Sequence, residues 1–159
     1  MHSKLDRIFR AKAGDRDELL QNYSVGDLFP SESIVLEGEE RFLFCFISLY
    51  CLDCVDLLPH LNKMSELFSG EFILFTDASH KENREITDHF GYKFTLISCT
   101  KEELAMKYRV YLTPFIYVLD SNSVVIAAHN VKNEAELMRL LKSLSLLKPL
   151  TTTEAGDSA

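Results

Sequence analysis

The sequence predicts an α/β fold in which a central mixed β-sheet is sandwiched between helical layers. Short and nearly continuous apolar runs, such as residues 42–49, are typical of strands that are buried on both faces of a sheet. These runs alternate with helical patterns, and the chain closes with a hairpin and a helix. With 159 residues, of which 47% are hydrophobic, the chain is long enough for one domain with a single core.

The first third of the chain is predicted to lead from a helical extension into the sheet. Residues 1–24 form the extension, because apolar side chains recur there at helical spacing. A turn at residues 25–30 and a short strand at residues 33–37 follow. After the buried strand at 42–49, a helix with one apolar stripe is expected over residues 51–68.

The rest of the chain continues the alternation of strands and helices. Strands are expected at residues 72–76, 94–98, 113–119 and 124–128, and helices at residues 82–90, 101–108 and 134–147. The last two strands are joined by a short polar segment of hairpin type, Asp-Ser-Asn-Ser. The domain is therefore predicted to span residues 25–148, and the small, polar tail at 149–159 is expected to be disordered.

Composition argues against several classes of function. The formal net charge of -7 and the absence of a basic run disfavour a nucleic-acid partner. No segment is long and apolar enough to span a membrane, and residues 1–10 lack the apolar stretch of a secretory signal. As written, the chain is expected to be cytoplasmic, or extracytoplasmic if a leader or anchor was removed from it.

The most informative motif is Cys51-Leu52-Asp53-Cys54, which lies directly between the apolar strand and the helix. Two thiols at this spacing in the first helical turn can exchange a disulfide with a partner. Unpaired backbone N–H groups at the helix start favour a thiolate on Cys51, which is therefore the expected nucleophile. Cys54, one turn further in, is the expected resolving thiol. The carboxylates of Asp53 and Asp56 disfavour a second anion, which predicts a dithiol closer to a reductant than to a strong oxidant.

Three positions in register make the sequence resemble the thioredoxin superfamily. The CxxC matches the redox pair of that family, Pro59 matches the proline that kinks its redox helix, and Thr113-Pro114 matches its cis-proline. The additional helix and strand at residues 82–98 are similar to those of the cytochrome-maturation thioredoxins and the peroxiredoxins. The resemblance implies a thioredoxin-like three-layer sandwich and a thiol-disulfide oxidoreductase.

The resemblance also implies roles for individual residues and partners. Thr113 and Pro114 would pair with an extended client segment, and Tyr50, in place of the usual tryptophan, would flank the site as an apolar platform. The clients would be protein or peptide thiols and disulfides, a second dithiol would supply or accept electrons, and no cofactor is implied. Cys45 occupies the position of the buried acid of thioredoxin, and Phe44 that of the peroxiredoxin proline.

Two other functions stay open on the sequence alone. One is a binding module that kept the fold and holds a peptide or protein without turnover. The other is an accessory protein dedicated to the maturation of one cysteine-containing client. A metal site is not expected, because Cys51 and Cys54 would need two further N or S ligands and His60 is the only nearby histidine. Cys45 is expected in the core, and Cys99 could form a regulatory disulfide.

Overall fold

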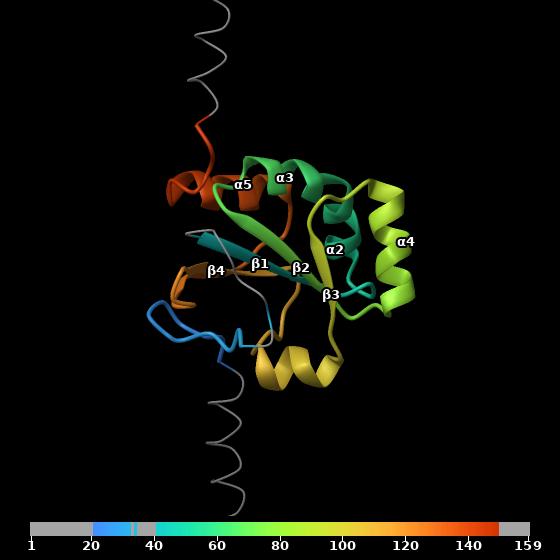
Figure 1. Ribbon diagram of the computed structural model, residues 1–159, viewed down its shortest axis with the longest axis horizontal. Coiled ribbons are helices and arrows are strands. Elements are labelled where there is room, and N and C mark those ends of the chain that lie inside the picture. Colours follow the sequence, from blue (N-terminus) through green and yellow to red (C-terminus); the bar gives the residue numbers. More distant parts are fainter. Residues whose placement is uncertain (1–20, 33, 35–40, 150–159) are drawn as a thin grey trace, which may run out of the picture.

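The computed structural model describes residues 21–32, 34 and 41–149 (Figure 1). The predicted helical extension, the strand expected at 33–37 and the predicted tail lie almost entirely outside these residues. The remainder forms a layered α/β structure, in which helices cover both faces of one sheet.

The sheet has five strands in the order β3-β2-β1-β4-β5. Its central strand, β1 (Arg41–Ile47), runs parallel to β2 (Glu71–Thr76), and β2 runs parallel to β3 (Thr95–Ser98). On the other side of β1, β4 (Phe115–Asp120) and then β5 (Val125–Asn130) are added as an antiparallel hairpin. The predicted mixed sheet is confirmed.

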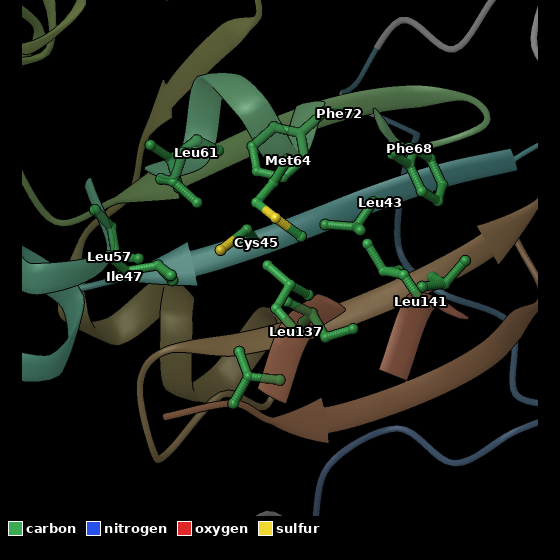
Figure 2. Packing of buried hydrophobic residues seen from close by; sticks show 14 of the residues in the cluster. Leu43, Cys45, Ile47, Leu57, Leu61, Met64, Phe68, Phe72, Leu137 and Leu141 are labelled. Carbon is green, nitrogen blue, oxygen red and sulfur yellow. The ribbon is translucent and has the colours of Figure 1, made fainter. Parts of the chain in front are cut away.

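One face of the sheet is covered by α2 (Leu52–Leu57), α3 (Leu61–Leu67) and α5 (Glu134–Ser143), while α4 (His80–Phe90) lies beside β3 (Figure 1). Figure 2 shows the core on this face, where Cys45 on β1 lies among leucines, Met64 and Phe72. Every second residue of β1 points to these helices. The members from β1 are Leu43, Cys45 and Ile47.

The opposite face of the sheet is covered by aromatic side chains. Phe42, Phe44 and Phe46 alternate with the residues above and pack in this second cluster. Phe29 and Tyr108, which lie outside the sheet, stack with ring centroids 5.6 Å apart and cover it. The predicted burial of β1 on both faces is therefore confirmed, and the motif that follows β1 is anchored in the most deeply buried strand.

The helix expected over residues 51–68 is divided into three parts. α2 ends at Leu57, a 3-10 turn, η1 (Leu58–His60), follows, and α3 begins at Leu61. The division falls at Pro59, which has no N–H to donate to the preceding turn. The CxxC motif is therefore carried by a short first segment that ends before Pro59.

Two other predicted helices differ in their ends or type. The last helix ends at Ser143 rather than at residue 147, because Ser145 adopts a positive φ of 56° and the Leu146 N–H bonds the Leu141 carbonyl. The helix expected at 101–108 has π geometry over η2 (Glu103–Lys107), where the Tyr108 N–H reaches back to the Glu103 carbonyl. The wider turn brings Tyr108 into the aromatic core.

Candidate active site

The CxxC motif lies at the carboxyl end of the central strand. β1 ends at Ile47, three connecting residues follow, and Cys51 is the N-cap residue of α2 with extended backbone angles. An N-cap side chain accepts a hydrogen bond from the first helical turn, and here the acceptor is sulfur. The Cys54 N–H donates to Cys51 Sγ at 3.3 Å. The predicted placement at the strand-to-helix junction is therefore observed.

The two thiols have different surroundings. Both cysteines are free; Cys51 is partly exposed, whereas Cys54 is fully buried. The Cys51 thiol donates to the backbone carbonyl of Thr113 at 3.3 Å. The Ser48 N–H donates to Cys54 Sγ at 3.5 Å. Only one of the two sulfurs is therefore reachable by a disulfide of another molecule.

Burial raises the pKa of the Cys54 thiol, and the neighbouring Cys51 raises it further, while the Thr113 side chain and the Ser48 N–H act in the opposite direction. Burial also raises the pKa of Cys45, which lies close enough to Cys54 to be affected by its charge. Cys54 is thus a protonated thiol near neutral pH. Cys45, at the position of the buried acid in thioredoxin, is also protonated and offers no base to Cys54.

Thr113 and Pro114 lie against the CxxC motif, as the contact between Thr113 and Cys51 shows. The peptide bond between them is cis. The Pro114 carbonyl accepts hydrogen bonds from the Val131 N–H at 3.0 Å and from the Asn130 side-chain amide at 2.8 Å. These bonds hold the start of β4, so that the backbone of Thr113 is presented at a fixed place beside Cys51.

Tyr50, the expected apolar platform, is 86% exposed. The ammonium of Lys101 lies 5.2 Å from the centre of its ring, within the range of a cation–π contact. Leu52, which follows Cys51 in the chain, is 81% exposed. The sequence shows no basic residue adjoining the motif, whereas the fold brings Lys101 to its edge because the loop after β3 ends near the loop after β1.

Two polar residues for which the sequence predicted no role, Ser48 and Asp77, also lie in this region. The carboxylate of Asp77 accepts a hydrogen bond from the Ser48 hydroxyl at 2.5 Å and another from the Leu49 N–H at 2.9 Å. Ser48 directly follows β1 and Asp77 directly follows β2, two parallel neighbours that end in the pair Ile47 and Thr76. The signal available in the sequence was a polar residue after each of two buried runs.

Among residues 21–32, 34 and 41–149, no three His, Cys, Asp or Glu side chains are grouped so as to hold a metal ion. Within the same residues, no helix has the length and hydropathy needed to cross a membrane.

Comparison with known proteins gives matches in structure only. No protein-family model matches the chain, and no curated protein matches it in sequence. A peroxiredoxin-like protein from Aquifex aeolicus matches with a TM-score of 0.60 and 15% identity, over 78% of this chain and 89% of that one. A thio-disulfide isomerase from Thermus thermophilus gives a TM-score of 0.57 and 15% identity, over 80% and 100% of the two chains.

A third match is the thioredoxin domain of a thiol-disulfide oxidoreductase from Bacteroides vulgatus, with a TM-score of 0.57 and 12% identity over 77% of this chain and 99% of that domain. Identities this low bear on the fold alone. The chain has a thioredoxin-like fold, and the fold predicted from its sequence is confirmed.

Proposed function

We propose that this protein is a thiol-disulfide oxidoreductase that exchanges a disulfide with protein or peptide clients through Cys51 and Cys54. One observation carries the proposal: an accessible sulfur and a buried sulfur share one helical turn, and the accessible one contacts the backbone of Thr113. Exchange needs an exposed attacking thiolate and a second thiol that can reach the mixed disulfide. The thioredoxin-like fold supports the same class of reaction.

In the reducing direction, the Cys51 thiolate attacks one sulfur of a client disulfide. The client S–S bond breaks, one client sulfur leaves as a thiolate that takes up a proton, and Cys51 is joined to the other. Cys54 then loses its proton and attacks Cys51 Sγ, which releases the second client sulfur and leaves a Cys51–Cys54 disulfide. A partner dithiol reduces that disulfide, and the steps in reverse oxidise a client.

Thr113, Pro114 and Tyr50 are proposed to bind the client beside Cys51. In the dithiol, the Thr113 carbonyl accepts a hydrogen bond from the Cys51 thiol. Once Cys51 is ionised, this carbonyl can accept a hydrogen bond from a backbone N–H of an extended client segment. The client would then pair with Thr113 as a neighbouring strand does. The exposed ring of Tyr50, the residue before Cys51 in the chain, adds apolar contact area for the client.

One observation favours a second candidate, a module that binds cysteine-containing clients with little turnover, including the dedicated accessory protein for one client. Cys54 is buried with a raised pKa, and the residue behind it is Cys45 rather than an acid that could take its proton. Slow resolution would prolong the mixed disulfide. Turnover therefore distinguishes the two candidates.

The test is multiple turnover with a disulfide-containing peptide and dithiothreitol as the electron donor, followed by chromatography of the peptide thiols. The oxidoreductase is expected to reduce many equivalents of peptide, and Cys51→Ala to reduce none above the uncatalysed rate. A wild-type protein that adds nothing to the uncatalysed rate, but captures one equivalent of peptide as a mixed disulfide when dithiothreitol is left out, would favour the binding module instead.

A further inference from the structure

We infer that Asp77 and Ser48 are positioning residues for the resolving step: the Asp77 carboxylate fixes Ser48 so that its backbone N–H stays directed at Cys54 Sγ while the thiolate develops there. The inference rests on the proposed function and specifies how its second step is assisted. The reaction is the one given above, in which Cys54 gives its proton to solvent, bonds to Cys51 Sγ and expels the client sulfur. The client disulfide is the oxidant.

Ser48 is hydrogen-bonded to three residues of the segment that carries the motif, Tyr50, Cys51 and Cys54. Its N–H donates to Cys54 Sγ at 3.5 Å, its hydroxyl oxygen accepts the Tyr50 N–H at 3.2 Å, and its carbonyl accepts the Cys51 N–H at 3.1 Å. A displacement of Ser48 would therefore move both cysteines relative to each other. Ser48 therefore links the loop between β1 and α2 to both cysteines.

Asp77 holds Ser48 and the next residue from the neighbouring strand. One carboxylate oxygen accepts the Ser48 hydroxyl at 2.5 Å, and the other accepts the Leu49 N–H at 2.9 Å. Hydrogen bonds to a charged acceptor are stronger than those between neutral groups. Because β2 lies next to β1 in the sheet, Asp77 is itself attached to a rigid element. Ser48 is thus attached to the sheet twice, through the chain to β1 and through its hydrogen bond with Asp77 to β2.

The need for such a device follows from the burial of Cys54. An anion that forms at a buried sulfur has lost its water and depends on nearby donors. The Ser48 N–H is one of the groups that counteract the raised pKa of Cys54, and its nitrogen lies 3.5 Å from the sulfur, a separation typical of an N–H···S hydrogen bond. As the thiolate forms, the contact tightens only if Ser48 is already correctly placed.

A charge effect of Asp77 would have the opposite sign. The carboxylate is negative, so its field alone disfavours a thiolate on Cys54, and its removal would speed the resolving step. Loss of positioning would slow that step. The two effects can be separated by comparing Asp77→Ala, which removes charge and acceptors, with Asp77→Asn, which removes the charge but keeps an acceptor for the Leu49 N–H.

The test is stopped-flow reaction of the full, reduced protein with Ellman's reagent, with release of thionitrobenzoate followed against pH. Attack by Cys51 releases the first equivalent at a rate that rises with reagent concentration. Attack by Cys54 on the resulting mixed disulfide releases the second at a rate independent of reagent. Ser48→Ala and Asp77→Ala are expected to slow the second phase about tenfold and to shift its pH dependence upward, since a hydrogen bond to a charged group is involved.

In Ser48→Ala and Asp77→Ala, the rate of the first phase should change less than the rate of the second. Asp77→Asn and Ser48→Thr should retain most of the wild-type rate of the second phase. Matched controls are Ser143→Ala, which removes an exposed hydroxyl that bonds the Leu140 carbonyl, and Asp88→Asn on α4; both should leave the two phases unchanged. A melting temperature for each variant reports stability separately.

Three results would overturn the inference. The first is a second phase unaffected in Ser48→Ala and Asp77→Ala despite lower melting temperatures, which would mean a structural role only. The second is a faster second phase in both Asp77 variants, which would mean a charge effect. The third is equal slowing of both phases. Failure of the proposed function is distinct from these: the wild type would then release one equivalent and form no internal disulfide.

Discussion

The asymmetry of the two thiols can be tested by exchanging each cysteine in turn for serine. In a background with Cys45→Ala and Cys99→Ala, the variant Cys54→Ser keeps the accessible sulfur and Cys51→Ser keeps the buried one. Alkylation by iodoacetamide at pH 7.5 then reports one thiol at a time. Cys54→Ser is expected to be alkylated much faster than Cys51→Ser.

The size of the effect follows from burial. The pKa of Cys54 is raised from 9.0 to about 12, mainly by burial, which lowers its thiolate population about a thousandfold. A more basic thiolate is a better nucleophile, with a Brønsted coefficient near 0.5, and this offsets about thirtyfold of the loss. Compared with a thiol of ordinary pKa, Cys54 is therefore expected to react about thirtyfold more slowly, before the steric protection of a sulfur with 0% exposure is added.

A rate for Cys51→Ser within about threefold of that for Cys54→Ser would refute the reasoning, because both thiols would then be accessible and ionised to a similar degree. A control with the same background in urea should bring the two rates together, since unfolding exposes both sulfurs. If the difference persisted in urea, its cause would be local sequence rather than burial.

The remaining predictions concern stability. Burial raises the pKa of Cys99 from 9.0 to about 12, and the charge of Glu103 adds to the shift. The folded state therefore keeps a proton that the unfolded state loses above pH 9, so the free energy of unfolding should fall as the pH rises from 9 towards 12. The urea midpoint of Cys99→Ala should fall less over this pH range than that of the wild type. Gly70 has a φ of 155°, and a Cβ there would lie 2.7 Å from the Phe68 ring and would also overlap the Arg41 carbonyl. Gly70→Ala should therefore lower the free energy of unfolding by about 2 kcal/mol, more than Gly91→Ala, whose Cβ would meet open space. A lower urea midpoint for Gly91→Ala than for Gly70→Ala would contradict this. The Asn133 side chain caps α5 through the Glu136 N–H at 2.9 Å, and Asn133→Ala should cost about 1 kcal/mol in the same assay, whereas no change would mean that the cap is replaced by water.

Much of the sheet could be predicted from local patterns. Runs such as Phe42 to Ile47 are apolar on both faces, and only a central strand buries both. The ends of the helices were harder to predict from the sequence. The last helix ends at Ser143 because Ser145 adopts a left-handed conformation that costs a non-glycine residue energy, and nothing in the local sequence requires this. Tertiary contacts of Leu146 and Leu147 offset the cost.

The candidate site was predictable where one segment holds its residues, and not where residues that follow different strands come together. Cys51 and Cys54 are neighbours on one helical turn, so their spacing was enough to place them. Asp77 and Lys101 reach the same region only because β1, β2 and β3 are parallel and their following loops converge at one edge. That convergence depends on the order of the strands, which no single segment specifies.

The most direct test of the central claim is the reduction potential of the Cys51–Cys54 pair. The protein, with Cys45 and Cys99 replaced by Ala, is equilibrated in glutathione or dithiothreitol buffers of graded potential, quenched with acid, and its free thiols are counted. The oxidoreductase predicts one reversible two-electron transition from two free thiols to none, at a potential closer to that of a reductant than of a strong oxidant. Two free thiols in every buffer would contradict the account, because Cys51 and Cys54 would then not form a working redox pair.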